Sequence, residues 1–200
     1  MRNQFPLFNT PLDLAHSFWE KILKEGDAVI DATCGNGKDS LVLANLLKDK
    51  SDTALYCLDI QKKALENTKE LLSKQSPHFL PSVQFILSSH EVLPKTDPRQ
   101  LKLIVYNLGY LPGADKTLTT ETSSTVQSVI NALKLICPGG VISINCYPGH
   151  LEGKKEQEAL LTLLAPLDPK LWSVTFLSWE NRNASPSLLL IQKSFLSSQL

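Results

Sequence analysis

One short stretch constrains the fold of this chain more than any other: the glycine turn Asp31-Ala32-Thr33-Cys34-Gly35-Asn36-Gly37. The apolar run Ala28-Val29-Ile30 precedes it, and a segment with helical periodicity follows over 38–47. Gly35 and Gly37 allow the backbone to turn tightly and to approach a ligand closely. The following helix would point free N–H groups and its positive end at a carboxylate or phosphate. The order strand, glycine turn, helix therefore predicts a nucleotide-type binding corner.

The spacing of the glycines distinguishes this corner from a dinucleotide site. Dinucleotide sites read G-x-G-x-x-G, whereas here the pattern is D-x-x-x-G-x-G and Ser40 stands at the third glycine position. This pattern, which starts at Asp31, resembles the first motif of the class I methyltransferases, which bind S-adenosylmethionine. A second apolar strand over 54–58 ends at Asp59, whose carboxylate could accept both hydroxyls of a ribose. An ordinary strand-to-helix loop is the alternative, and Asp59 disfavours it.

Strand-like and helix-like segments alternate along the chain. Strands are predicted over 28–32, 53–58, 83–87, 101–106, 141–146, 171–179 and 187–192, and helices over 10–23, 38–47, 61–72, 121–136 and 154–164. Such alternation predicts an α/β fold with a mostly parallel sheet and helices on both faces. The last two strands have no helix between them and are expected to be antiparallel. The pattern resembles the Rossmann-like, seven-stranded sheet of class I methyltransferases, with strand order 3-2-1-4-5-7-6 and strand 7 antiparallel.

Composition limits the class of protein. We expect residues 1–200 to form one domain, with 1–25 as a helical segment that packs on the core. The formal net charge of zero counts against binding nucleic acid by charge alone, although a local basic patch stays possible. No apolar run approaches the ~20 residues of a membrane helix, and the N-terminus lacks the pattern of a signal peptide, so a cytoplasmic location is expected.

The four cysteines are scattered, at Cys34, Cys57, Cys137 and Cys146, with no C-x-x-C pair. This predicts free, mostly buried thiols and neither a disulfide framework nor a metal site. Cys34 lies in the glycine turn, where it could line the ligand pocket.

A second group of informative residues follows the strand over 101–106. The chain breaks there into Asn107-Leu108-Gly109-Tyr110-Leu111-Pro112-Gly113. This is the position of the catalytic loop in amino-group methyltransferases, which often carry Asn-Pro-Pro-Tyr; Leu108 and Gly109 replace the prolines. The Asn107 side-chain oxygen and the Leu108 carbonyl could accept the N–H groups of an amine and aim its lone pair, and the Tyr110 ring could stack on a flat group. Such positioning is worth up to roughly 7–11 kcal/mol.

An amine must lose a proton before it attacks a methyl group. An alkyl ammonium has a reference pKa of about 10.4, and burial favours its neutral form. Asp115 and His150 are candidate proton acceptors. The alternatives are that His150 caps a turn or faces solvent, and that Asp115 is a surface residue or pairs with Lys116.

A longer run makes the resemblance more specific. Residues 107–116, with Thr119-Thr120 after them, resemble the signature of a small methyltransferase family labelled as rRNA methylases. This family includes the bacterial tRNA 5-aminomethyl-2-thiouridine methyltransferases. Further matches are 31–39, 59–61, 89–91, 147–150 and 181–183, so the resemblance extends from about residue 10 to residue 193.

The resemblance implies an enzyme that uses S-adenosylmethionine to methylate a wobble uridine in the anticodon region of tRNA. The 5-aminomethyl group would become 5-methylaminomethyl. Carried over by position, the cofactor site would include Asn36, Lys38 (through its backbone N–H), Asp39, Asp59, Gln61, Ser89 and His90. The substrate site would include Leu108, Gly109, Lys116, Thr120, Tyr147 and Asn181. The resemblance is also compatible with a homodimer.

Several points stay open. Ala114 stands where a second glycine is common, and Arg182 where Gln is expected, so substrate fit could differ. His16 is expected to pack and hydrogen-bond within the protein, with closure over the cofactor as the alternative. Methylation of rRNA or of a small amine is an alternative function. A non-catalytic cofactor-binding module is another, which the presence of Asn107 and Tyr110 disfavours.

Overall fold

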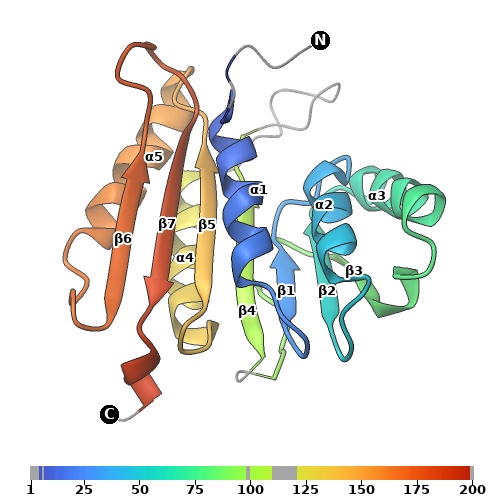
Figure 1. Cartoon of the computed structure of the whole chain (residues 1–200). Coiled ribbons are helices and arrows are strands. Elements are labelled where there is room, and N and C mark those ends of the chain that lie inside the picture. The colour runs from blue at the N-terminus through green and yellow to red at the C-terminus, as the bar shows by residue number, and fades with distance from the viewer. Residues whose placement is uncertain (1–4, 6, 98–99, 110–120, 199–200) are drawn as a thin grey trace.

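The computed structural model describes residues 5, 7–97, 100–109 and 121–198. Its centre is a seven-stranded sheet with the order β3-β2-β1-β4-β5-β7-β6 (Figure 1). β1 through β5 pair in parallel, and β7 is antiparallel to both β5 and β6. The strands are β1 (Ala28–Asp31), β2 (Ala54–Asp59), β3 (Val83–Leu87), β4 (Leu101–Asn107), β5 (Val141–Cys146), β6 (Trp172–Leu177) and β7 (Ser187–Lys193). The predicted strand order and the antiparallel last pair are confirmed.

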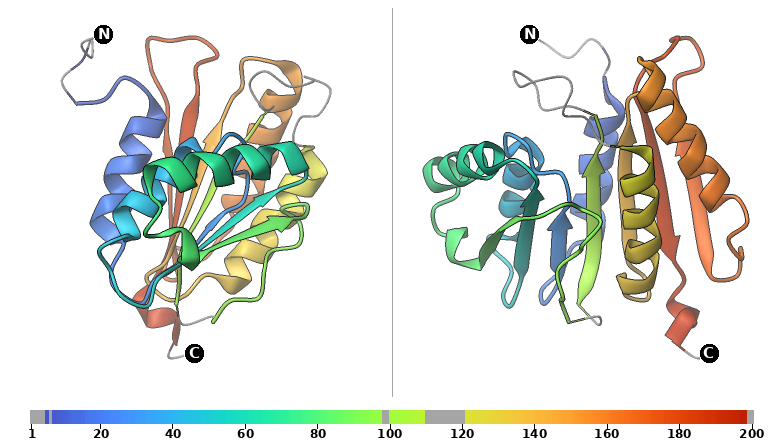
Figure 2. Two further views of the ribbon diagram at one scale, coloured as in Figure 1. Left: turned by 90° about the vertical axis from the view of Figure 1, so that its right-hand side faces the viewer. Right: turned by 180° about the vertical axis from the view of Figure 1, so that it is seen from behind.

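Helices cover both faces of the sheet (Figure 2). The helices α1 (Pro11–Ile22), α2 (Lys38–Leu47) and α3 (Lys62–Gln75) pack on one face, and α4 (Thr122–Leu135) and α5 (Leu151–Leu164) on the other. Short 3-10 helices are η1 (Leu80–Ser82) and η2 (Phe195–Ser198). Side chains alternate along β4: Leu103 and Val105 join the first core, and Ile104 and Tyr106 the second. Central strands therefore read as continuous apolar runs, as expected of a sheet covered on both sides.

The N-terminal helix α1 is fixed at its start and along its inner face. Thr10 caps it, because its hydroxyl accepts a hydrogen bond from the Asp13 N–H at 3.1 Å while an Asp13 carboxylate oxygen accepts one from the Thr10 N–H at 2.9 Å. Ala15 and Trp19 are buried in the core below. These contacts therefore fix which side chains of α1 face the sheet.

Several predicted boundaries are wrong at element ends. α5 begins at Leu151 instead of 154, because His150 caps it. α3 continues to Gln75 instead of ending at 72, and β4 includes Asn107. β6 ends at Leu177, two residues before the predicted end at 179. Apolar periodicity locates the buried middle of an element, whereas caps and exposed last turns decide its ends.

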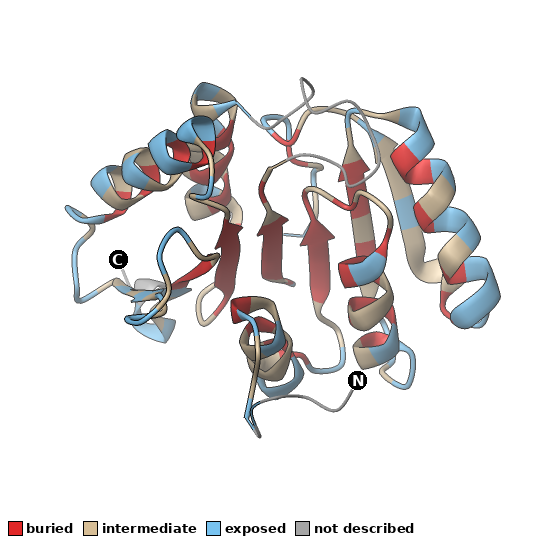
Figure 3. Cartoon of the chain, turned by 90° about the horizontal axis from the view of Figure 1, so that it is seen from above, coloured by how far each residue is buried: buried red, intermediate tan, exposed pale blue. Residues whose placement is uncertain are grey.

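Figure 3 looks onto the edge of the sheet where the parallel strands end, and it shows the central strands buried between the helices.

All four cysteines are free and buried, as predicted. Burial raises the pKa of the Cys34 thiol, so Cys34 is a protonated thiol at neutral pH. Within the described part of the chain, no helix is long and apolar enough to cross a membrane.

Candidate active site

The glycine turn between β1 and α2 packs closely against α3. Gly37 has a φ of +79°, and a Cβ at this position would lie 2.9 Å from the Thr68 Cα. The Thr68 hydroxyl also donates a hydrogen bond to the Gly35 carbonyl at 2.9 Å. Asn36, between the two glycines, accepts a hydrogen bond from Asn67 at 3.0 Å. The turn is therefore held in one conformation, with the N-terminus of α2, from Lys38 onward, facing the end of the sheet.

Asp59 joins the ends of β1 and β2. One of its carboxylate oxygens accepts a hydrogen bond from the Gly35 N–H at 3.0 Å, and the other accepts one from the Gln61 N–H at 2.9 Å. Each oxygen keeps a second lone pair, so the oriented carboxylate can still receive two hydroxyl groups. This arrangement fits the ribose contact predicted for Asp59 from the sequence.

Asp31 lies inside the turn and is fully buried. Its carboxylate accepts hydrogen bonds from the Ser40 hydroxyl at 2.6 Å and from the Thr33 N–H at 3.3 Å. Burial, together with the charge of Asp39, raises the pKa of Asp31 to about 7. Its side chain therefore holds the turn together, and a part of the Asp31 population is protonated near neutral pH.

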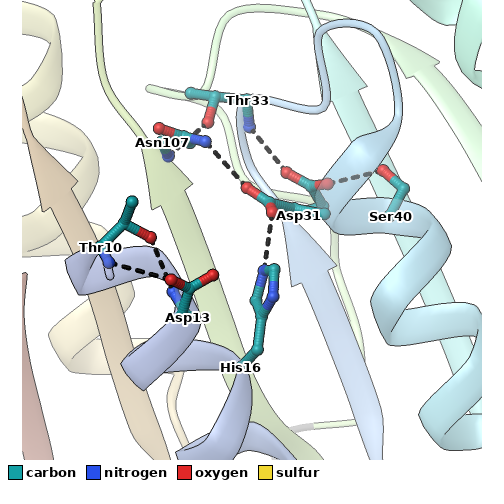
Figure 4. A network of polar contacts seen from close by, with 8 residues as sticks. Thr10, Asp13, His16, Asp31, Thr33, Ser40 and Asn107 are labelled. Atoms are coloured by element: carbon teal, nitrogen blue, oxygen red, sulfur yellow. Dashed lines mark hydrogen bonds and ion pairs between the residues drawn. The ribbon is translucent and has the colours of Figure 1, made fainter. Parts of the chain in front are cut away.

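Asn107, at the end of β4, is fixed by both its backbone and its side chain (Figure 4). Its N–H donates to the Thr33 hydroxyl at 2.7 Å, and its side-chain NH₂ group donates to Asp39 at 2.9 Å. The other Asp39 oxygen lies 2.9 Å from Nε2 of His16. Asp39 thus bridges α1 and β4, and the Asn107 carbonyl oxygen points away from that contact.

Tyr147 and Gly109 adjoin Asn107. Burial raises the pKa of the Tyr147 hydroxyl, as does the Asp39 charge, while a hydrogen bond with the Asn107 side chain lowers it in part. A Cβ on Gly109, whose φ is +114°, would lie 3.9 Å from the Tyr147 ring, so these two residues are neighbours. Leu108 points into the second core and donates its N–H to the Asn145 carbonyl at 3.0 Å. At the end of β4, the Asn107 amide is therefore held in place beside the protonated hydroxyl of Tyr147.

Comparison with known proteins assigns the chain to a family. The model of the family described as "Putative rRNA methylase" matches residues 55–193. A chloroplastic tRNA (mnm(5)s(2)U34)-methyltransferase of Arabidopsis thaliana is 32% identical over 191 residues, which are 90% of this chain and 68% of that protein. The chain belongs to the rRNA methylase family.

Solved structures agree with this assignment. A "putative rRNA-methylase" from Clostridium thermocellum is 33% identical, with a TM-score of 0.86 over 93% of this chain and 98% of the other. A "putative methyltransferase" from Streptococcus mutans, solved in complex with SAH, is 29% identical, with a TM-score of 0.79 over 93% and 99% of the two chains. This member of the rRNA methylase family is therefore a class I methyltransferase, and its corner residues fit S-adenosylmethionine: a tight glycine turn, a helix N-terminus and an oriented Asp59.

The side chains of two histidines predicted to belong to the site, His90 and His150, contact helices instead. The Nδ1 atom of His150 accepts a hydrogen bond from the Gly153 N–H at 3.1 Å, so the proton of the neutral ring is on Nε2, which is buried and has no partner among the described residues. His150 therefore caps α5, the alternative left open by the sequence, and offers no free lone pair. His90 is 8% exposed, and its Nε2 lies 3.4 Å from the Thr125 hydroxyl beside α4. Burial lowers the pKa of His90.

The remaining predicted positions divide into two groups. Tyr110, Asp115, Lys116 and Thr120, like Ala114, lie outside the described residues. Ser89 accepts a hydrogen bond from the Glu91 N–H at 3.2 Å at the end of β3, and Asn181 is exposed in the β6–β7 connection.

Arg182, the other departure from the family pattern, has a structural role. Its guanidinium lies 4.1 Å from the centroid of the Trp179 ring and donates a hydrogen bond to the Asn9 carbonyl at 3.1 Å. Arg182 therefore ties the segment before α1 to the β6–β7 connection.

Sequence reasoning missed two residues that shape this site, Thr33 and Thr68, and it did not identify Asp39 as the hydrogen-bond partner of His16. Thr33 receives the Asn107 N–H, and Thr68 braces the glycine turn. Thr33 lies two residues after the buried strand β1, and this position was a usable signal. Thr68 and His16 come from helices whose rotation against the sheet no local pattern specifies.

Proposed function

We propose that this methylase transfers a methyl group from S-adenosylmethionine to the 5-aminomethyl nitrogen of a wobble 2-thiouridine in tRNA. The observation that carries the proposal is the Asn107 amide, whose NH₂ group is held by Asp39 at 2.9 Å while its carbonyl oxygen points away from that contact. A primary amine needs such an acceptor to orient its lone pair. The name of the relative from Arabidopsis thaliana supports a tRNA substrate of this kind.

The chain's own residues account for most of the chemistry by positioning. When bound, S-adenosylmethionine supplies an electrophilic methyl group, and the carbon–sulfur bond breaks as the amine nitrogen bonds to the methyl carbon. The Asn107 oxygen accepts an N–H of the amine, and the half-buried Tyr147 and the buried Leu108 limit the access of water beside it. Because His150 caps α5, we propose that the amine binds as its free base, which burial favours.

The direct test is methylation of tRNA from cells that lack this modification. The purified methylase and S-adenosylmethionine should convert 5-aminomethyl-2-thiouridine to its N-methyl derivative, detected by mass spectrometry of digested nucleosides. The Asn107→Ala variant serves as the control for enzyme-dependent transfer. An unchanged 5-aminomethyl nucleoside in the presence of active, folded protein would refute the proposed substrate.

The family description favours rRNA as a second candidate substrate. The same assay with rRNA fragments, and with the free nucleoside, separates the possibilities. Transfer to rRNA without transfer to tRNA would support this second candidate. Transfer to the nucleoside as efficient as to tRNA would indicate a small-amine methyltransferase.

A further inference from the structure

We propose that His16 of α1 is a positioning residue for methyl transfer, and that it sets the orientation of the Asn107 amide through Asp39. This inference rests on the proposed function and adds a residue from the N-terminal helix to its machinery. His16 does not itself contact the reacting atoms.

Three elements meet in this series of contacts, whose two end residues, His16 and Asn107, are labelled in Figure 4. His16 Nε2 and Asp39 Oδ1 are 2.9 Å apart, and Asp39 Oδ2 accepts from the Asn107 NH₂ group at 2.9 Å. The His16 side chain is 27% exposed, whereas that of Asp39 is 8% exposed. This series of hydrogen bonds therefore begins at a partly exposed side chain on α1, passes through a buried carboxylate on α2 and ends at the last residue of β4.

The direction of the hydrogen bonds selects one orientation of the amide. Rotation of the Asn107 amide by 180° would place its carbonyl oxygen against a carboxylate oxygen of Asp39, which is repulsive. The hydrogen bond to the Asp39 carboxylate therefore keeps the NH₂ group on the Asp39 side and leaves the carbonyl oxygen for the amine. The Asn107 N–H, bound to Thr33 at 2.7 Å, fixes the backbone, so the side-chain torsion is the remaining freedom.

His16 keeps Asp39 in the role of acceptor. Asp39 lies near Asp31, whose pKa is raised by its burial and, to a smaller extent, by the charge of Asp39. A ring N–H donated by His16 at 2.9 Å fixes the rotation of the Asp39 carboxylate, so that its other oxygen faces the Asn107 NH₂ group. A rotated Asp39 carboxylate would release the NH₂ group and leave the orientation of the Asn107 amide unfixed.

The position of His16 is well defined. Its ring packs on that of Trp19, with centroids 4.7 Å apart, and Trp19 is buried in the first core. The capping box of Thr10 and Asp13 fixes the first turn of the same helix. These contacts hold the imidazole at Asp39 without help from a ligand.

The test compares His16→Leu and His16→Ala, which remove the donor, with His16→Gln, whose amide can still donate to Asp39. Glu20→Gln, on the exposed side of α1, is the matched control. With tRNA as substrate, loss of the donor should lower kcat roughly ten- to hundredfold, and His16→Gln should recover most of it. The affinity for S-adenosylmethionine, measured by calorimetry, should change less than about threefold in all four variants, since the turn and Asp59 remain in place.

A second readout does not depend on the substrate. In ¹⁵N-labelled protein, the side-chain NH₂ resonances of Asn107, assigned by their loss in Asn107→Ala, should shift or broaden in both donor-free variants and return in His16→Gln. Unchanged resonances together with unchanged kcat would overturn the role of His16. Unchanged resonances with a lower kcat would also overturn it, since His16 would then act by another route.

These outcomes separate the inference from the proposed function. If the wild-type protein fails to methylate tRNA, the proposed substrate is wrong, and the NH₂ resonances alone then decide whether His16 controls Asn107. If tRNA is methylated and the resonances do not respond to His16, the proposed function stands and this inference fails.

Discussion

At the scale of single residues, the proposed mechanism depends on the orientation of one side-chain amide. Asn107 donates to Asp39 on one side and has its oxygen on the other. We expect Asn107→Ala to lower kcat at least 100-fold, because the amine loses its orienting acceptor. Affinity for S-adenosylmethionine should stay within about threefold, measured by calorimetry on the same preparation. A variant that keeps near wild-type turnover would contradict the positioning role.

Asp31 makes a second prediction at this scale. Its pKa is raised from 3.8 to about 7, so between these values the folded protein holds a proton that the unfolded chain has released. This raised pKa means that folding stability falls as the pH rises through that window, by at most about 4 kcal/mol. Asp31→Asn carries no titrating carboxyl, so its stability relative to wild type should increase from pH 4 to pH 8. Urea unfolding at both pH values measures this difference, and a difference independent of pH would contradict it.

Residue types at strand ends could be predicted from the sequence, but side-chain directions could not. Asp59 and Asn107 follow apolar runs directly, and parallel strands end at a common edge, so both were placed correctly. His90 and His150 also follow strands. Their rings instead contact α4 and cap α5, because packing against a helix decides where each ring points.

At the scale of elements, Gly37 of the glycine turn and Gly26, which precedes β1, form a matched pair for substitution. Gly26 and Gly37 have φ values of +77° and +79°, but a Cβ on Gly26 meets nothing within 4 Å, whereas one on Gly37 would lie 2.9 Å from the Thr68 Cα. Both alanine variants carry the same backbone strain, of roughly 1–2 kcal/mol. Gly37→Ala should therefore be less stable than Gly26→Ala by about 1–3 kcal/mol, the usual cost of overpacking. Equal unfolding free energies would show that α3 does not brace the turn.

The capping box of α1 gives a prediction for a whole helix. Thr10→Ala removes the hydroxyl that accepts the Asp13 N–H at 3.1 Å, and it should lower stability by about 1 kcal/mol. Thr10→Ser keeps the hydroxyl and is the control. In thermal unfolding, Thr10→Ala should have a lower melting temperature than the wild type and Thr10→Ser. If Thr10→Ala is as stable as Thr10→Ser, the hydroxyl cap does not stabilise α1.

The start of a helix could be predicted from the sequence only where its capping residues form a recognisable pattern. Thr10, Pro11 and Asp13 form a recognisable start signal, and α1 begins where they predict. α5 lacks such a signal, since a histidine caps it, and its first turn was therefore missed. Apolar periodicity was sufficient for the strands, whose observed ends all lie within two residues of the predicted ones.

At the scale of the whole molecule, the strand order followed from the alternation of elements and the resemblance to class I methyltransferases. Short right-handed crossovers leave few arrangements for such a chain. The contact between His16 and Asp39 could not be predicted in this way. It depends on how α1 is rotated and shifted against α2 after both have packed on the sheet, a property of the assembled core.

The central claim concerns the geometry between the Asn107 oxygen and the substrate amine. A crystal structure with S-adenosylhomocysteine and an anticodon stem-loop carrying 5-aminomethyl-2-thiouridine tests it most directly. We expect the amine nitrogen to lie about 3 Å from Asn107 Oδ1, in line with the sulfur, while Asp39 still accepts the hydrogen bond from the NH₂ group. An amine that contacts the NH₂ group, or that lies beyond hydrogen-bond reach of Asn107, would contradict it.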